Sequence, residues 1–185
     1  MPDSSGDIEA ALFASAVAQV AVAAGRDDTL PTLTGIRMEI EGGNIVLAAT
    51  DRYRLAVREF SWNPKSSSIS VNALIPAKTL ADTAKSLSTT DLVTIALSAG
   101  GSGEGLIGFE GAGRRTTTRL LDGEFPKYRT LLPSEAATVA SVDTSALADA
   151  VKRVALVAER NTPVRLAFEG SEVVLRAGAG DDAQA

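Results

Sequence analysis

The residues that could do chemistry in this chain are limited by two absences, because its 185 residues include no Cys and no His. Thiolate catalysis, disulfides and imidazole metal sites are therefore excluded, and so is a histidine general base. Acid–base chemistry would have to use Asp, Glu, Lys or Tyr, for example Asp51 or Lys78. The sequence shows no cluster of such groups that promises strongly shifted pKa values. We expect no catalytic residue, and keep an α+β enzyme with Asp or Lys chemistry as a second hypothesis.

A glycine pattern raises the question of a dinucleotide cofactor. Gly103–Gly108 reads GEGLIG and matches GxGxxG. That fingerprint works only where a helix follows and points its N-terminus at the pyrophosphate. The next residues, Phe109–Gly113, indicate a strand end and a turn, so we expect hairpin glycines and no cofactor.

Charged clusters give equally weak signals. The pairs Asp27-Asp28 and Asp181-Asp182 lack the loop spacing of a calcium site, so no metal is expected. Arg114–Arg119 alternates Arg and Thr as on the wet face of a strand. No aromatic platform accompanies it, which argues against binding of single strands by base stacking.

The segment Ala49–Val57, ATDRYRLAV, is the most informative stretch. Small apolar residues run into Thr-Asp, then Arg-Tyr-Arg, then a new apolar alternation. The pattern predicts a tight turn between two strands, in which Asp51 bonds the backbone two residues on. Two arginines and a tyrosine at such a turn would form a good rim for a peptide pocket.

Composition bounds the class of protein. The chain is 45% apolar and 22% charged, which indicates a globular protein, and the net charge is −5. Tight nonspecific DNA binding is therefore not expected, although a topological embrace of DNA with local positive stripes is compatible with it. The absence of Cys fits a cytosolic protein. Residues 10–24 are almost wholly apolar but too short for a membrane span, and predict a buried helix.

The order of elements predicts a repeat. A helix at 8–24 precedes strands at about 33–41, 44–49 and 53–62; a strand at 69–75 and a helix to about Leu87 precede strands at 92–98, 104–110 and 113–121. A strand at 138–142, a helix from the Asp143 region to about Arg160, and strands at 164–169 and 172–177 follow. Glycine turns at 41–44 and 169–171 predict hairpins. The expected unit is a helix plus three strands in an α+β fold.

The helices are expected to be amphipathic. In the second, Leu80, Ala84 and Leu87 share one face. In the third, the apolar stripe is Leu147, Val151, Val154 and Ala158. In the first, Ser15, Gln19 and Arg26 lie in one sector. We predict one complete domain at 1–133, containing two units, and a truncated domain at 134–185.

Three segments together resemble the bacterial DNA sliding clamp, the β subunit of DNA polymerase III: Thr34–Ile36, Ala49–Val57 and Gly123–Pro133. The resemblance implies the clamp fold, with antiparallel sheets outside and helices lining an inner face. Sliding clamps of this family are homodimeric rings with three similar domains per subunit, which encircle duplex DNA and act as polymerase processivity factors. The chain is similar to the middle domain and the start of the third, so we expect a partial clamp.

The resemblance also implies a partner-peptide site that binds DNA polymerase III α subunit, clamp loader and repair proteins. Its matching positions are Leu33, Thr50, Arg52, Tyr53, Arg54, Leu55, Pro126, Thr130 and Leu131. The leucines and Pro126 would offer an apolar slot for Leu or Phe anchors. Part of the family's pocket wall comes from the end of the third domain, so weakened peptide binding is expected.

The remaining positions follow from the same resemblance. Arg26, Lys78, Lys85 and Arg153 would face double-stranded DNA through a few phosphate contacts without sequence specificity. Leu156 and Val157 match the dimer interface, and no closed ring is expected from this chain alone. The implied location is the cytoplasm, at the nucleoid, with no membrane partner. The third hypothesis is a peptide-binding module unrelated to replication.

Overall fold

The computed structural model describes residues 4–98, 105–133, 135–159 and 162–177. The chain divides into two compact units, Met1–Leu132 and Pro133–Ala185.

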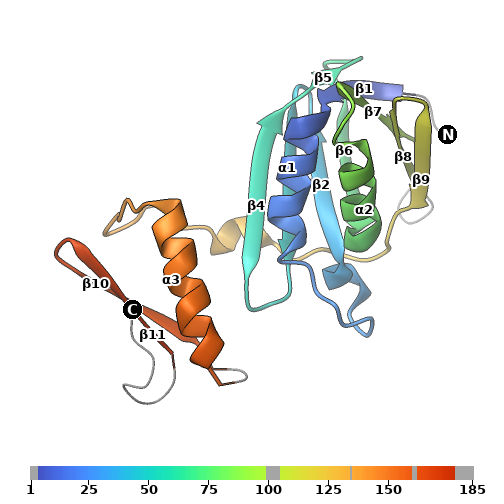
Figure 1. The fold of residues 1–185 in the computed structure, drawn as a ribbon. Coiled ribbons are helices and arrows are strands. Elements are labelled where there is room, and N and C mark those ends of the chain that lie inside the picture. Colours follow the sequence, from blue (N-terminus) through green and yellow to red (C-terminus); the bar gives the residue numbers. More distant parts are fainter. Residues whose placement is uncertain (1–3, 99–104, 134, 160–161, 178–185) are drawn as a thin grey trace. The chain divides into compact units, whose positions relative to one another are not determined.

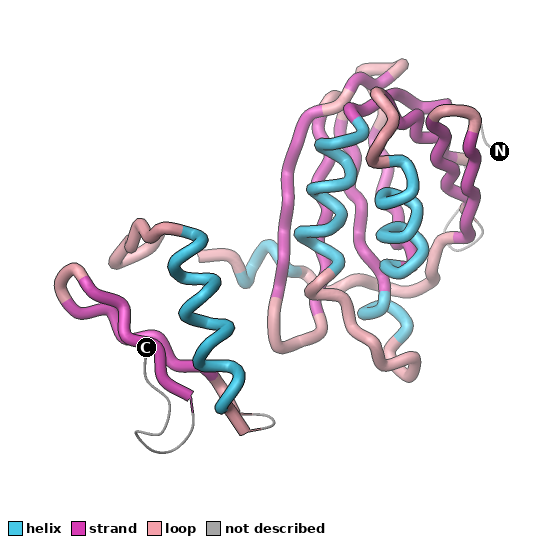
Figure 2. Tube along the Cα trace, viewed as in Figure 1, coloured by secondary structure: helices cyan, strands magenta, loops and turns pink. Residues whose placement is uncertain are grey.

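The first unit contains two helices, two 3-10 turns and nine strands within its described residues. In chain order the elements are β1 (Ser4–Glu9), α1 (Ala10–Ala21), η1 (Pro31–Thr34), β2 (Gly35–Glu41), β3 (Asn44–Thr50), β4 (Leu55–Ser61), β5 (Asn63–Pro64), β6 (Ser70–Pro76), α2 (Ala77–Leu87), β7 (Leu92–Leu97), β8 (Leu106–Gly111), β9 (Arg114–Arg119) and η2 (Tyr128–Leu131). Figure 2 shows the alternation of strands and helices along the trace.

The strands form two antiparallel sheets, with orders β4-β3-β2-β6 and β5-β1-β7-β8-β9. The predicted repeat of a helix and three strands is present twice: α1 with β2, β3 and β4, and α2 with β7, β8 and β9. The strand that enters each helix joins the sheet of the other repeat, because β1 pairs with β7 and β6 pairs with β2. This exchange ties the two repeats into one domain, and the predicted α+β fold built from helix-plus-three-strand units is confirmed.

Both helices pack on the sheets and against each other (Figure 1). α1 is rich in Ala and presents Phe13, Val17 and Val20, each fully buried. The ring of Phe13 stacks on that of Phe109 from β8, with centroids 5.5 Å apart. On α2 the predicted face of Leu80, Ala84 and Leu87 is buried, whereas Lys78 and Lys85 are exposed. One continuous core therefore joins both helices to both sheets.

The far side of the four-stranded sheet carries a smaller apolar cluster. Ala48 and Leu74 are covered there by Phe125 and Tyr128 from the segment that closes the unit. Alternation along β3 explains this, because Leu47 and Ala49 enter the main core while Ala48 points the other way. Both faces of β3 are thus buried.

The predicted hairpin at 41–44 is confirmed, with Glu41 opposite Asn44 and Gly42 at φ +54°. Glycine accepts this left-handed conformation without the steric cost of a Cβ. The start of the chain was predicted wrongly. Residues 8 and 9 end strand β1 rather than begin a helix, because their backbone pairs with β7. α1 ends at Ala21, so Arg26 lies in the following loop and not on a helical sector with Ser15 and Gln19.

The second unit contains α3 (Thr144–Val157) and the hairpin of β10 (Val164–Glu169) and β11 (Glu172–Ala177). Asp143 caps α3, since its carboxylate accepts a 2.8 Å hydrogen bond from the amide of Ala146. The hairpin has the predicted bounds and turns at Gly170, φ +59°.

Two predictions in this unit are wrong. Residues 138–142 form no strand, because in the described part of the unit β10 and β11 pair only with each other. Val151 is exposed, whereas Leu147, Ala150, Val154 and Ala158 pack with the hairpin. The true stripe includes Ala150 because Leu147 and Val154 are seven residues apart, and position 150 lies between them on the same face.

Candidate functional site

The β3–β4 connection is a tight turn held by two side chains. The Thr50 hydroxyl donates to the Arg54 carbonyl at 2.8 Å and accepts from the Arg52 amide at 3.2 Å. The Asp51 carboxylate accepts from the amides of Tyr53 at 3.1 Å and Arg54 at 3.0 Å. The bond from Asp51 to the backbone two residues on is thus confirmed. Thr50 is buried and Tyr53 is 92% exposed, so the turn projects its aromatic ring into solvent.

Asp51 is unsuited to catalysis. Burial raises its pKa, but the two amide hydrogen bonds and the positive charge of Arg54 outweigh burial and hold the pKa below its ordinary value. The Arg54 Nε atom lies 3.0 Å from its second carboxylate oxygen. A carboxylate that is already bonded on both oxygens is a weak base, so the enzyme hypothesis gains nothing at this site.

The opposite wall comes from the loop after α1. The Gly25 amide donates to the Leu33 carbonyl at 2.7 Å, which joins this loop to η1. The Asp27 carboxylate accepts from the amide and the hydroxyl of Thr29, at 2.9 and 2.6 Å. These bonds, with the positive charge of Arg52, lower the pKa of Asp27. Leu33 is 8% exposed and anchors the wall in place.

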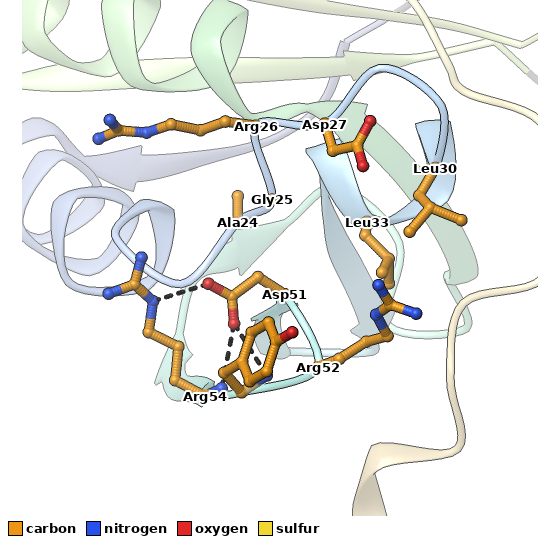
Figure 3. Close-up of a pocket in the computed structure, with 10 residues that line it drawn as sticks. Ala24, Gly25, Arg26, Asp27, Leu30, Leu33, Asp51, Arg52 and Arg54 are labelled. Atoms are coloured by element: carbon orange, nitrogen blue, oxygen red, sulfur yellow. Dashed lines mark hydrogen bonds and ion pairs between the residues drawn. The ribbon is translucent and has the colours of Figure 1, made fainter. Parts of the chain in front are cut away.

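A hollow of about 640 Å³ lies between these two walls (Figure 3). It is lined by Ala24, Gly25, Arg26, Asp27, Leu30, Leu33, Asp51, Arg52, Tyr53 and Arg54. Four of the nine residues expected to bind a partner peptide are among them: Leu33, Arg52, Tyr53 and Arg54. Leu30 and Leu33, with arginines and a tyrosine around them, can hold an extended segment that carries apolar anchors.

The other five expected residues belong to the β3–β4 connection or to the segment that covers the smaller apolar cluster of Ala48, Leu74, Phe125 and Tyr128. Thr50 fixes the turn, and Leu55 pairs opposite it and packs against the cluster of Ala48, Leu74, Phe125 and Tyr128. Pro126 and Thr130 line a second hollow of about 310 Å³ together with Arg37 and Glu39. Leu131 is 68% exposed and lines neither hollow. Leu55 itself lines neither of the two hollows and packs on the smaller apolar cluster.

Sequence reasoning missed a hydrogen-bonded cluster centred on Glu39. One carboxylate oxygen accepts from Arg37 Nε at 2.6 Å, and the other accepts from the Tyr128 hydroxyl at 3.1 Å and from Arg129 Nη2. The Arg129 guanidinium lies 5.4 Å from the centre of the Tyr128 ring. The outward position of Glu39 on β2, between inward Met38 and Ile40, was the only signal available in the sequence.

The protonation of this cluster is fixed by its geometry. Burial raises the pKa of Glu39, but hydrogen bonds from Arg37, Arg129 and Tyr128 outweigh it and hold the pKa below its ordinary value. Burial, reinforced by the Glu39 charge, raises the pKa of Tyr128. At neutral pH Glu39 is therefore ionised and Tyr128 is a neutral donor.

The expected DNA-facing residues are exposed. Arg26 and Lys78 line a third hollow of about 520 Å³ between the end of α1 and the start of α2. Lys78 Nζ lies 3.2 Å from Asp82 Oδ2. Lys85 lies on the same face of α2, two turns on. Arg153 lies on α3 in the second unit and is exposed.

Leu156 and Val157, the expected dimer residues, end α3 and are 84% and 62% exposed. Large apolar side chains left in solvent at adjacent positions are typical of an interface.

The remaining sequence patterns can be followed only where the structure describes their residues. Gly105 to Gly108 enter strand β8 and β9 follows, so no helix meets the glycine pattern; Gly103 and Glu104 lie outside the described residues, as does the Asp181-Asp182 pair. Arg115 pairs with Glu110 at 3.0 Å and Arg114 donates to the Ser86 carbonyl. No group of three or more acidic residues in the described ranges could hold a metal. None of the helices in those ranges has the length and apolar character that a bilayer span requires.

Comparison with known proteins gives two family matches. The model for the DNA polymerase III beta subunit, central domain, matches residues 7–127. The model for the C-terminal domain of the same subunit matches residues 129–185.

Curated relatives agree. A beta sliding clamp from Streptomyces coelicolor is 64% identical over the whole chain, which covers 49% of that protein. One from Micrococcus luteus is 52% identical, and 59% of it is covered. The chain thus spans about half the length of the curated relatives it matches.

Solved structures show the same fold. The DNA polymerase sliding clamp of Bacillus subtilis superposes with a TM-score of 0.84 at 25% identity, covering 98% of this chain and 47% of that one. The sliding clamp of Pseudomonas aeruginosa gives 0.84 at 22% identity, covering 100% and 50%.

Proposed function

The chain belongs to the DNA polymerase III β subunit family, and we propose that it carries the peptide-docking surface of a DNA sliding clamp. The whole protein would encircle duplex DNA as a homodimeric ring and act as a processivity factor. It would tether the polymerase α subunit, the clamp loader and other proteins that carry a clamp-binding motif. Tethering raises the effective concentration of polymerase at the primer end without any new contact to the DNA. A processivity factor of this kind needs no residue to do catalytic chemistry.

The observation that carries the proposal is the turn of Thr50–Arg54 facing Leu33 across one hollow. The turn is braced by Thr50 and Asp51, so its backbone is fixed before a peptide arrives. A turn that is already ordered loses less conformational entropy when a peptide binds, which favours affinity for a short segment. Leu33 and Leu55 supply apolar surface for Leu or Phe anchors, and Pro126, Thr130 and Leu131 extend it on the other side.

The expected DNA-facing residues support the proposal that the whole protein encircles DNA. Arg26, Lys78 and Lys85 are exposed cations around the end of α1 and along α2. With a net charge of −5, the chain is not expected to hold DNA tightly by itself. A ring needs only a few phosphate contacts, because it is retained by topology and must slide. We place Arg153 with this set, Leu156 and Val157 at the subunit interface, and the protein at the nucleoid in the cytoplasm.

The test is fluorescence polarisation of a labelled clamp-binding peptide from a bacterial replicative polymerase, titrated with this chain. A second peptide has its Leu and Phe anchors changed to Ala. We expect saturable binding by the first peptide only. Equal binding of both peptides, or of neither, would count against a docking site in this chain.

A control separates clamp docking from a peptide-binding module unrelated to replication. Unlabelled clamp-binding peptides from the clamp loader and from a repair protein are added as competitors. A sliding clamp binds them at one site, so each should displace the labelled peptide completely. Failure of both competitors would favour the unrelated module.

A further inference from the structure

The hollow between Leu33 and the Thr50–Arg54 turn, the main hollow, is lined by charged side chains that differ in how free they are to bind a ligand. Three arginines and two aspartates line it: Arg26, Arg52, Arg54, Asp27 and Asp51. Asp51 and Arg54 are joined by a 3.0 Å ion pair. Asp51 also accepts two amide hydrogen bonds. These two residues therefore satisfy each other within the turn and leave little charge for a ligand.

Arg52 stands apart from this pair. Within the described part of the chain its guanidinium makes no ion pair or hydrogen bond, although its charge acts on Asp27 across the rim. The Asp27 carboxylate is instead bound by the amide and hydroxyl of Thr29. In the view of Figure 3, the Arg52 side chain reaches toward Leu33, while Arg26 extends away from both. Arg52 thus sets an available cation beside the apolar wall.

The backbone at Arg52 is unfavourable for arginine. Its φ of +77° lies in the left-handed region, which among the described non-glycine residues only Ala112 shares. Residues with a Cβ avoid this region, and such conformations persist where the surroundings enforce them, often at functional sites. Here the Thr50 hydroxyl holds the Arg52 amide. Glycine would fit the turn with less strain but would bring no charge.

We propose that Arg52 makes this hollow selective for linear peptides that carry a carboxylate next to their apolar anchors. The inference rests on the proposed peptide-docking function. A carboxylate beside Leu33 could accept charge-assisted hydrogen bonds from the Arg52 guanidinium. Because the rim is exposed, the gain is modest and screened by salt.

The experiment compares two labelled peptides with identical Leu and Phe anchors, one with Glu and the other with Gln at the position beside them. Both are titrated with the full chain by fluorescence polarisation, at about 0.05 M and about 0.5 M NaCl. We expect the Glu peptide to bind about three- to fivefold more tightly at low salt. The ratio should approach one at high salt.

Three variants assign the selectivity to its residue. Arg52→Gly should abolish the preference and raise the melting temperature, since it removes both the charge and the strain. Arg26→Gln removes one charge from the other side of the rim and should leave the ratio unchanged. Asp27→Asn removes the carboxylate that opposes Arg52 and should increase the ratio. Opposite changes in stability and selectivity in Arg52→Gly exclude a folding defect as the cause.

The outcomes distinguish a failure of the proposed selectivity from a failure of the proposed peptide-docking function. Equal affinity of the wild-type chain for both peptides, or an unchanged ratio in Arg52→Gly, overturns the selectivity and leaves peptide docking intact. An equal loss in Arg26→Gln shows a general charge effect and overturns the role of Arg52. Absence of saturable binding by either peptide overturns the proposed function and this inference with it.

Discussion

The Tyr128 hydroxyl donates a 3.1 Å hydrogen bond to the carboxylate of Glu39, a residue 89 positions earlier in the chain. Arg129 donates to the same oxygen and Arg37 to the other. Glu39 thereby fastens η2 to the outer face of β2. The expected peptide-site residues Pro126 and Thr130 flank Tyr128 and Arg129, so this one carboxylate holds that part of the proposed site against the sheet.

Glu39→Gln should lower the free energy of unfolding by about 1–3 kcal/mol. The amide keeps the shape of the side chain but loses the charge that binds two guanidinium groups and the tyrosine. Urea unfolding followed by circular dichroism measures the difference. Glu41→Gln is the control, because Glu41 lies on the same strand and face and is exposed. A loss of similar size in the control would show that the cluster is not responsible.

The contribution of Glu39 should depend on pH in a defined direction. Its pKa in the folded chain lies below the ordinary value of 4.5, so folding favours the ionised form. The stabilisation is complete above 4.5 and is lost as the pH falls through the folded value. The difference in unfolding free energy between wild type and Glu39→Gln should be constant from pH 7 to about pH 5.5 and shrink at lower pH. A difference that grows on acidification would contradict the assignment.

Thr50→Val, a nearly isosteric change, should cost about 1–3 kcal/mol of stability. The Arg52 amide loses its hydroxyl acceptor, and the Arg54 carbonyl keeps only the 3.4 Å hydrogen bond from the Asp51 amide. Peptide affinity should fall with it, since the turn is no longer fixed. Thr50→Ser keeps the hydroxyl and should restore most of both properties. Thermal unfolding and peptide titration on the three proteins provide the measurement, and a serine variant as poor as valine would shift the cause to packing.

Tyr53→Ala should leave stability within about 0.5 kcal/mol of wild type, because the side chain is 92% exposed. Peptide affinity should fall by about five- to thirtyfold if the ring covers a bound anchor, as aromatic residues at interface hot spots do. Tyr53→Phe keeps the ring and removes the hydroxyl, so its peptide affinity separates the contributions of the two groups. Unaltered affinity in Tyr53→Ala would remove this residue from the site.

Local patterns explain what the sequence could predict. The hairpin at Gly42, the Asp51 turn, the buried face of α2 and the β10–β11 hairpin each depend on residues within a few positions of one another. Turn chemistry and periodicity report such contacts directly. Four expected peptide-site residues meet in one hollow for the same reason, since three belong to a single turn.

Contacts between residues far apart in the chain explain the features that the sequence could not predict. β1 was missed because its short segment becomes a strand by pairing with distant segments: β5, and β7 about 85 residues later. The Glu39 cluster joins β2 to η2, and no spacing in the sequence marks Tyr128 and Arg129 as its partners. Residues 138–142 were predicted as a strand from composition and from the repeat, but a strand also requires a partner.

The double substitution Lys78→Gln with Lys85→Gln should weaken association with duplex DNA at low salt while peptide affinity stays unchanged. Both lysines lie on the exposed face of α2, and neither lines the main hollow. Glutamine is preferred to glutamate at position 78, because a glutamate there would repel Asp82, the present partner of Lys78. If each lysine meets one phosphate, the slope of log affinity against log salt should fall by about 2. Anisotropy of a labelled duplex measures it, and Arg119→Gln with Lys127→Gln removes the same charge from other exposed positions. An equal decrease in that control would show that net charge, and not the α2 face, governs the association.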